Sequence, residues 1–250
     1  MLKKGVVLSC VLVFLTAGIA SAYRPLTTED AGVAGKGVAQ AELSWDNIKW
    51  KNSDKEEIFL LVSIYGLTEN LELSVEIPYL YHKPASRPSE EGTGDIKIVA
   101  KYLLVPGGTE SPAFAVKGVV KMDNGDYGRG LGSGDKDYSI VAALSETVGQ
   151  LTGHAQIGYT WIGKNKDNNL REITFYGAAL DYAASDDLHL LCEFSQSHNQ
   201  DSAASEDPRS ALSGLTYKVS DSLVVDAAYR WGLNDSAPYT GTTVGVSVTF

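Results

Sequence analysis

The last twelve residues of the chain, 239–250, alternate between apolar and small polar side chains. Because successive side chains of an extended strand point to opposite sides, the valines at 244, 246 and 248 share one side with Phe250, while Gly245 and Ser247 share the other. One side of such a strand is apolar and the other is small and polar. The pattern is typical of a strand in the wall of a membrane β-barrel, but the closing strand of a soluble β-sandwich would show it too.

The first 22 residues have the organisation of a secretory signal peptide. Lysines at positions 3 and 4 form a basic start, an apolar run follows over residues 5–19, and Ala20-Ser21-Ala22 supplies the small residues of a cleavage site. The apolar run is too short to span a bilayer comfortably, and Cys10 lies within it, which does not fit a lipoprotein signal. We therefore expect export and removal of residues 1–22.

Composition narrows the class of protein. Removal of the signal takes away two lysines, so the formal net charge falls from −10 to −12, with 19 Lys and Arg against 31 Asp and Glu. Such an acidic chain without a basic stripe is not expected to bind nucleic acid. Cys192 is the only cysteine after the signal, so we expect no intramolecular disulfide. No later stretch reaches the roughly 20 apolar residues of a transmembrane helix, so a membrane crossing would require a closed barrel.

The rest of the chain reads as a single domain of about twelve strands, joined by connections whose lengths alternate. The connections after odd-numbered strands are mostly long and hydrophilic, and the others are mostly short. Outer-membrane barrels show this asymmetry, with short periplasmic turns and longer extracellular loops, whereas a Greek-key sandwich has no reason to show it. The expected strands cover residues 37–50, 57–65, 71–79, 95–102, 113–121, 138–145, 151–161, 172–182, 188–195, 210–217, 223–231 and 239–250.

Aromatic residues lie near both ends of these strands. Trp45, Trp161 and Trp231 lie near the loop ends, and Tyr65 and Tyr102 near the turn ends, as expected for two belts at the membrane interfaces. We therefore predict an all-β fold: a transmembrane antiparallel β-barrel with up-and-down meander topology in the outer membrane, with both termini in the periplasm. The expected parts are a signal peptide at 1–22, an extended periplasmic lead-in at 23–36 and the barrel at 37–250.

Several short motifs lie between Arg24 and about Tyr138: residues 24–32 (RPLTTEDAG), 65–74 (YGLTENLELS), 94–96 (GDI) and 130–134 (GLGSG). They resemble segments of the meta-pathway phenol-degradation family. The resemblance implies an outer-membrane barrel associated with uptake of aromatic or other hydrophobic compounds, and it implies no catalytic residues. Residues 121–126 depart from it, because they read KMDNGD where Leu-Pro-Thr-Gly-Asp is more typical.

The polar face of the strands should line the inside of the barrel. Twelve strands about 4.8 Å apart and tilted by about 40° enclose a backbone radius on the order of 12 Å, which leaves a narrow passage or none. Antiparallel pairing would place Glu76 beside Lys97 and Glu72 beside Lys101, where the charges could bias solute passage or only neutralise one another. The predicted lumen-lining residues are Glu42, Glu72, Glu76, Lys97, Lys101, Lys117, His154, Glu193, Asp226, Arg230, Phe59 and Leu61.

An apolar component of the lumen is also predicted. It comprises Phe59, Leu61, Tyr65, Val99 and Leu191, which a general porin with a watery lumen would not need. This component favours a hydrophobic or aromatic solute.

Catalytic and metal-binding arrangements have little support in the sequence. His154 lacks a nearby serine, and Ser195 with His198 has no evident third partner. The remaining histidines show no metal-ligand spacing. We expect no enzyme, no cofactor and no metal site.

Two functions stay open. The first is a channel or uptake protein, surrounded by outer-membrane lipid, through which small aromatic or hydrophobic solutes diffuse passively. The second is a closed barrel with a structural or surface-interaction role. The sequence leaves the solute, the oligomeric state and the position of residues 23–36 undecided. The architecture depends on one contact, because the last strand must pair with the first to leave no edge in lipid.

Overall fold

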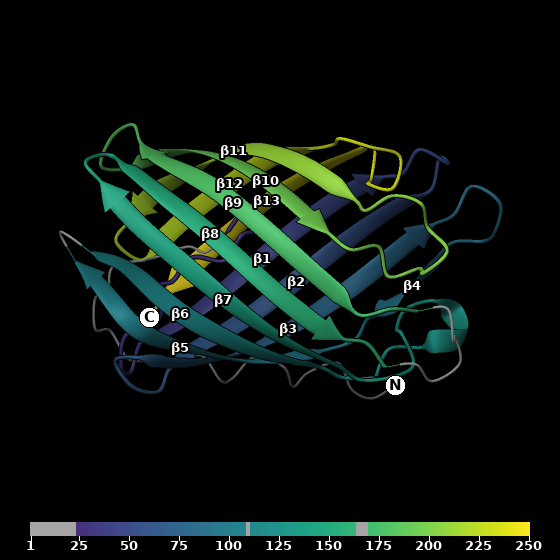
Figure 1. Cartoon of the computed structure of the whole chain (residues 1–250), viewed down its shortest axis with the longest axis horizontal. Helices are drawn as coiled ribbons and strands as arrows, with labels where there is room; N and C mark the ends of the chain where they lie inside the picture. Colours follow the sequence, from purple (N-terminus) through teal and green to yellow (C-terminus); the bar gives the residue numbers. More distant parts are fainter. Residues whose placement is uncertain (1–23, 109–110, 164–169) are drawn as a thin grey trace, which may run out of the picture.

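The computed structural model describes residues 24–108, 111–163 and 170–250, so the predicted export signal lies outside the described chain. The described residues form one antiparallel sheet of thirteen strands that closes on itself (Figure 1). Twelve long strands make the wall, and the short β4 pairs only with β3. The strands are β1 (Ala39–Lys49), β2 (Lys55–Gly66), β3 (Leu71–Lys83), β4 (Glu90–Thr93), β5 (Lys97–Gly108), β6 (Ser111–Lys121), β7 (Asp137–Val148), β8 (Leu151–Trp161), β9 (Ile173–Ala183), β10 (Leu188–Ser197), β11 (Arg209–Ser220), β12 (Leu223–Gly232) and β13 (Thr240–Thr249).

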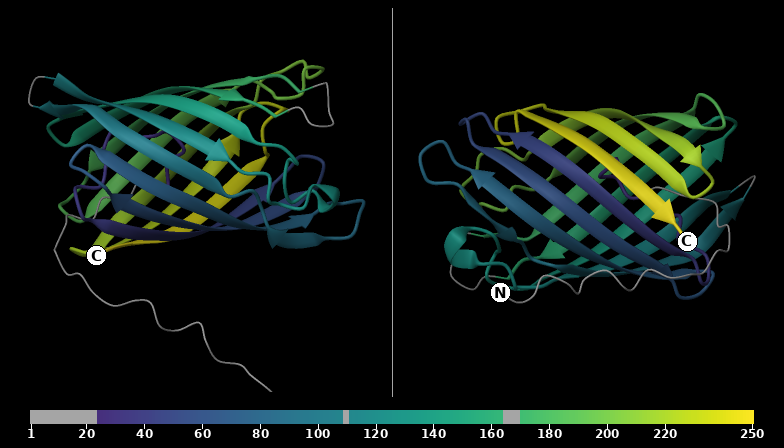
Figure 2. Two further views of the ribbon diagram at one scale, coloured as in Figure 1. Left: turned by 90° about the horizontal axis from the view of Figure 1, so that it is seen from below. Right: turned by 180° about the vertical axis from the view of Figure 1, so that it is seen from behind.

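The wall closes between β1 and β13, which lie side by side in the right-hand view of Figure 2. Their antiparallel register runs from Gln40 opposite Thr249 to Lys49 opposite Thr240. Within the described chain, each long strand therefore has a partner on both sides. The interior of a bilayer requires such closure, because lipid offers no hydrogen-bond partners to an open edge. The predicted antiparallel barrel is confirmed.

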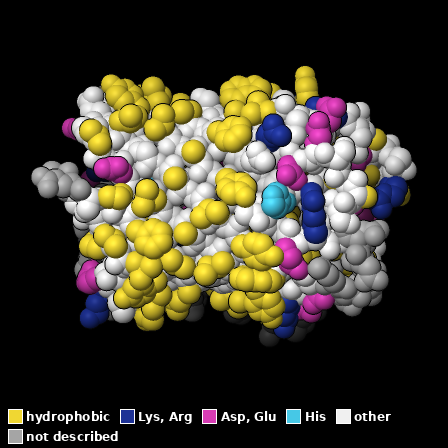
Figure 3. Space-filling view, viewed as in Figure 1, with side chains coloured by type: hydrophobic (Ala, Val, Ile, Leu, Met, Phe, Trp, Pro, Cys, Tyr) yellow, Lys and Arg dark blue, Asp and Glu magenta, His cyan; other side chains and the backbone are white. Residues whose placement is uncertain are grey.

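The outer surface of the wall is apolar. Hydrophobic side chains are spread over the middle of the barrel, and charged side chains gather toward its two ends (Figure 3). Leu43, Ile98 and Ile140, on three different strands, are all exposed. Exposure of so much apolar area would be unfavourable in water, whereas in a bilayer it meets lipid chains.

The side of β2 that points into the lumen is the opposite of the one predicted. Phe59, Leu61 and Tyr65 were expected to point into the lumen, but they lie on the outer surface with 46, 40 and 49% of their area exposed. Both faces of this strand are apolar, so alternation could not decide between them. Pairing with β1 decides, because it places Phe59 opposite Trp45 and Leu61 opposite Leu43 on the outer face. The inward face of β2 carries Leu60, Val62 and Ile64 instead.

The connections at the two ends of the barrel differ in length, as the sequence predicted. Residues 67–70, 149–150 and 221–222 form short turns at one end, on the left in Figure 1. Residues 122–136 and 198–208 are longer connections at the other end, on the right. The described residues contain no helix with the length and apolar character that a membrane crossing needs.

The structure adds one strand that the sequence did not indicate. Strand β4 lies between the expected strands 71–79 and 95–102 and pairs with the far end of β3, where Tyr79 lies opposite Thr93 and His82 opposite Glu90. Its sequence, Glu-Glu-Gly-Thr, has no apolar face, so alternation could not reveal it. The hydrogen-bonded wall therefore extends further on the loop side than expected.

Leu61→Lys should destabilise the barrel more than Leu60→Lys, because these neighbours point to opposite sides of the wall. A lysine on the lipid face near the middle of a bilayer costs about 2–4 kcal/mol. At position 60 the new side chain would face a cavity that polar groups also line. The measurement is the free energy of unfolding in phospholipid liposomes, with Leu61→Met as the control. Equal losses for the two lysine variants would contradict the assigned facing.

Candidate functional site

Residues 24–36, called the inner segment below, lie inside the barrel. The backbone N–H groups of Thr27 and Thr28 each donate to the Glu193 carboxylate of β10 over 2.6 Å. Further along, the N–H of Ala34 donates to Glu72 of β3, also over 2.6 Å. The inner segment thus crosses the lumen from one side of the wall to another. The sequence predicted a periplasmic lead-in for this stretch, and the structure instead places it among the charged side chains of the lumen.

The centre of the inner segment neutralises two lysines of the wall. Glu29 accepts hydrogen bonds from Lys101 of β5 over 2.8 Å and from Lys117 of β6 over 2.6 Å. Asp30 lies 3.4 Å from the same Lys101 ammonium. The Lys101 side chain is only 1% exposed, and a buried charge is costly unless an opposite charge accompanies it. These contacts are therefore a main reason for the segment to lie inside.

The start of the inner segment is held at the closing seam. The Arg24 guanidinium donates to the Thr243 hydroxyl of β13, and its Nε lies 3.6 Å from the carboxylate of Asp226 on β12. The Asp226 side chain is almost completely buried. Arg24 therefore supplies the positive charge that this carboxylate needs.

Inward-facing glycines make room for the inner segment. A Cβ atom at Gly177 of β9 would collide with the Thr28 side chain, and one at Gly66 of β2 would collide with the carbonyl oxygen of Gly35. At Gly245 of β13 it would lie 2.7 Å from Nε of Arg24. Any larger residue at these positions would have to displace the segment.

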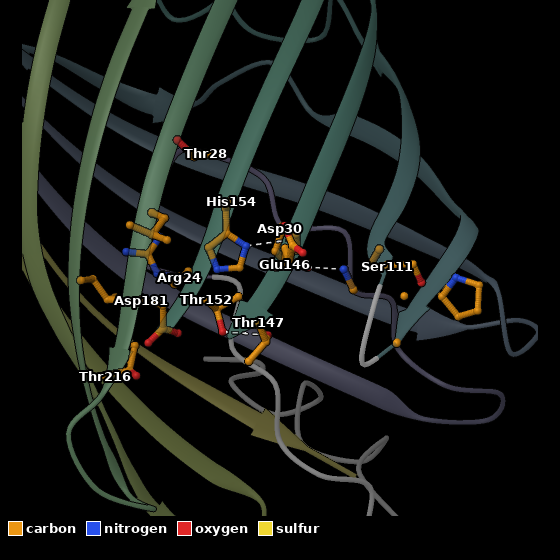
Figure 4. A pocket seen from close by; sticks show the side chains of 18 residues that line it. Arg24, Thr28, Asp30, Ser111, Glu146, Thr147, Thr152, His154, Asp181 and Thr216 are labelled. Atoms are coloured by element: carbon orange, nitrogen blue, oxygen red, sulfur yellow. Dashed lines mark hydrogen bonds between the residues drawn. The ribbon is translucent and has the colours of Figure 1, made fainter. Parts of the chain in front are cut away.

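The inner segment separates cavities within the lumen. On the short-turn side lies a cavity of about 380 Å³, where Arg24, Thr28 and Asp30 of the segment meet His154 and Asp181 of the wall (Figure 4). On the loop side lies a cavity of about 660 Å³, and a third cavity, of about 350 Å³, lies against the inward faces of β1, β2, β3 and β5. Arg24, Leu26 and Thr28 border the 380 Å³ and the 350 Å³ cavity alike. The inner segment therefore lies between these two cavities.

Most of the predicted lumen residues lie inside the barrel, with the exceptions of Phe59 and Leu61. Glu42, Glu72, Lys101, Glu193 and Asp226 are buried. Glu76 and Lys97 lie opposite each other, as predicted, and their charged groups are 2.9 Å apart. The other three border cavities: Lys117 the 350 Å³ one, His154 the 380 Å³ one, and Arg230 both the 350 and the 660 Å³ ones.

The apolar part of the lumen differs in composition from the prediction. Val99 and Leu191 lie inside, with 3 and 5% of their area exposed, whereas the contribution of β2 comes from Leu60, Val62 and Ile64. These three residues and Val99 all border the 350 Å³ cavity. An apolar strip next to charged groups gives this cavity an amphipathic wall.

The prediction that His154 lacks a nearby serine is wrong. The hydroxyl of Ser145 lies 2.8 Å from Nδ1 of His154, because these residues face each other across β7 and β8. The same hydroxyl accepts the N–H of Ala31 over 2.9 Å, so Ser145 holds the inner segment. Among the described residues, no group of three or more His, Cys, Asp or Glu side chains is placed to hold a metal ion.

Asp95, between β4 and β5, holds the loop 122–136 against the rim of the barrel. Its carboxylate accepts the N–H groups of Gly125 and Ser133, each over 2.8 Å, and lies 3.2 Å from the Lys121 ammonium. Burial alone would raise the pKa of Asp95, but these donors lower the pKa below the ordinary value. The sequence motifs at 94–96 and 130–134 therefore meet in this contact, which the sequence did not predict.

Comparison with known proteins decides the family. The family profile described as "Putative MetA-pathway of phenol degradation" matches residues 22–250. The chain belongs to this family. The resemblance that the motifs suggested is thereby confirmed. A comparison with curated proteins gave no match.

Several solved outer-membrane proteins share the fold. An outer-membrane channel from Pseudomonas putida F1 is 12% identical over 90% of this chain and 100% of its own, with a TM-score of 0.72. The KdgM porin is 12% identical over 84% of this chain and 99% of its own, with a TM-score of 0.56. The CymD monoaromatic hydrocarbon channel is 10% identical over 86% of this chain and 88% of its own, with a TM-score of 0.52. At these identities the likeness shows a barrel of the outer-membrane type.

Gly177→Val should displace the inner segment, because its side chain would occupy the position of Thr28. Overpacking of this kind costs about 1–3 kcal/mol. Leu26→Cys in a Cys192→Ser background reports the displacement through its rate of maleimide labelling, which should rise several-fold. Gly118→Val is the matched control, because a Cβ there comes no closer than 4.0 Å to a neighbouring atom. An unchanged rate with Gly177→Val would contradict the packing.

Asp95→Asn should loosen the rim loop without unfolding the barrel, because it weakens charge-assisted hydrogen bonds worth about 1–3 kcal/mol in total. Hydrogen exchange of residues 122–136, corrected for its intrinsic pH dependence, measures the change. Since the pKa of Asp95 is lowered, its stabilisation is complete above the ordinary value of 3.8 and is lost as the pH falls through the lowered value. In the Asp95→Asn variant, hydrogen exchange of the loop should show no such loss of protection as the pH falls. The Asp123→Asn variant, changed in the same loop, should still show it.

Proposed function

We propose that this protein is an outer-membrane channel for the passive uptake of small solutes with a hydrophobic or aromatic part, and that the inner segment controls how much of the lumen is open. One observation carries the proposal: the same residues of the inner segment border cavities on its two sides. A single length of chain therefore lies between these two cavities. Its displacement would join spaces that the barrel already contains.

The proposal includes the location of the protein. The apolar outer wall and the unequal lengths of the connections support insertion in the outer membrane, with the short turns and both termini in the periplasm. Residues 1–22 would direct export and then be removed. The inner segment would accordingly reach the lumen from the periplasmic side.

The nature of the solute is supported by the wall of the lumen. Leu60, Val62, Ile64 and Val99 form an apolar strip beside the 350 Å³ cavity. Small-molecule sites in proteins are mostly apolar with a few polar groups, and this cavity has that character. The family description names phenol degradation, and CymD, which shares the fold, is a monoaromatic hydrocarbon channel.

A second function is a closed barrel with a structural or surface-interaction role. The ion pairs of Glu29 with Lys101 and Lys117 favour it, because they hold the lumen shut and satisfy the charges of the wall. The two functions differ in one property, which is solute flux.

A reversible cross-link tests the proposed function. Thr28→Cys and Gly177→Cys, in a Cys192→Ser background, would place two thiols within reach, because a Cβ at Gly177 meets the Thr28 side chain. Oxidation should fix the inner segment to the wall and lower conductance in planar bilayers at least severalfold, and reduction should restore it. Equal conductance in both states would show that the inner segment does not control passage.

A control cross-link within the wall separates this effect from stiffening of the barrel. Thr147→Cys and Thr152→Cys face each other across β7 and β8, and neither belongs to the inner segment. Oxidation of this pair should leave conductance unchanged. Absence of conductance in every variant, reduced or oxidised, would favour the closed barrel.

A further inference from the structure

The wall of the lumen contains a buried lysine, Lys101, and a half-buried one, Lys117, whose shared carboxylate partner belongs to the inner segment. Lys101 and Lys117 lie opposite each other on β5 and β6, and the two oxygens of Glu29 bind one ammonium each. Glu29 thus presents a carboxylate to the wall much as a bound anion would. We propose that Lys101 and Lys117 form a binding site for the carboxylate of a transported solute, which competes with Glu29 for it.

This inference rests on the proposed function and names the class of solute. If the inner segment withdraws, Glu29 and Asp30 leave with it, and the lysines lose these negative charges. Uncompensated buried charge is costly, and a neutral hydrocarbon cannot offset it. A solute that carries a carboxylate can, so its binding would favour the state in which the segment is displaced.

The charges around the site indicate a monocarboxylate. Glu72 lies opposite Lys101, and withdrawal of the segment would remove the Ala34 N–H that Glu72 accepts. Glu72 is then placed to compensate Lys101, while Glu76 already pairs with Lys97 at 2.9 Å. Lys117 itself lies opposite Lys101 on β5 and Val141 on β7, so no carboxylate stands opposite it on the neighbouring strands once Glu29 has left. A single carboxylate group on the solute matches the charge of Lys117.

The surroundings of the lysines fit an apolar body on that carboxylate. Val99 lies between Lys97 and Lys101 on the inward face of β5, and Leu60, Val62 and Ile64 border the same cavity as Lys117. The volume of about 350 Å³ falls within the range of about 300–1,000 Å³ that small-molecule sites occupy. The site therefore suits an aromatic or short aliphatic monocarboxylate, with its charge at the lysines and its apolar part on this strip.

Displacement of the inner segment by a carboxylate can be measured on the purified full-length protein in detergent, without any flux assay. Leu26→Cys in a Cys192→Ser background reports the position of the segment through its rate of maleimide labelling. Sodium benzoate should accelerate labelling saturably, by about tenfold, as expected for a charge-assisted contact. Benzamide, which is neutral and of similar shape, should have little effect, and sodium chloride controls for ionic strength.

Variants of Lys117 distinguish recognition of the carboxylate from a general loosening of the inner segment. Lys117→Met will change the basal labelling rate, because Glu29 loses a partner, but it should also abolish the saturable response to benzoate. Lys117→Arg should retain that response, because it keeps the charge. Asp186→Asn, in an exposed turn at the short-turn end, controls for a change of net charge.

Three results would overturn the inference: equal acceleration by benzamide and benzoate, a benzoate effect no larger than that of chloride, or a full response in Lys117→Met. The proposed function is judged separately by the reversible cross-link. If conductance follows that cross-link while benzoate fails to displace the segment, the channel stands and the carboxylate site does not.

Discussion

A strand in lipid has no solvent to bind its backbone, so each N–H and C=O group of the wall must find a partner in the neighbouring strand. The pairing of β1 with β13 meets this requirement at the one place where neighbours in space are far apart in sequence. Closure then fixes the two sides of every strand, because alternate residues must face either lipid or the lumen. The apolar outer surface and the polar inner surface both follow from it.

Closure creates a second requirement inside the barrel. The lumen is narrow, and carboxylates and lysines on its wall are buried at Glu72, Lys101, Glu193 and Asp226. The inner segment supplies a partner for each of them. Its backbone N–H groups donate to Glu72 and Glu193, and its charged side chains pair with Lys101 and Asp226. These contacts are polar. An ion or a polar solute can offer partners of the same kind, which is the basis of the proposed displacement.

The motifs that indicated the family take part in two contacts within the molecule. Residues 24–32 belong to the inner segment, and Gly66, from the motif at 65–74, lies against the Gly35 carbonyl where that segment meets the wall. The other two motifs meet at the rim, where Asp95 binds the backbone of Gly125 and Ser133. The barrel wall itself needs only alternation, which many sequences satisfy. The inner segment and the rim loop need particular residues, since close packing and directed hydrogen bonds constrain them.

The sequence by itself determined the twelve long strands, their order and the unequal ends of the barrel, because the pleat and the two environments impose a period of two on each strand of the wall. It also determined that Glu76 and Lys97 are neighbours, which follows from antiparallel pairing of consecutive strands of the wall. Only the tertiary structure decided the facing of β2, whose faces are both apolar, and the contact of Ser145 with His154. It alone placed Glu29 between Lys101 and Lys117, which lie 72 and 88 residues away. No local period encodes a contact at such separation, because it exists only once the wall has closed around the inner segment.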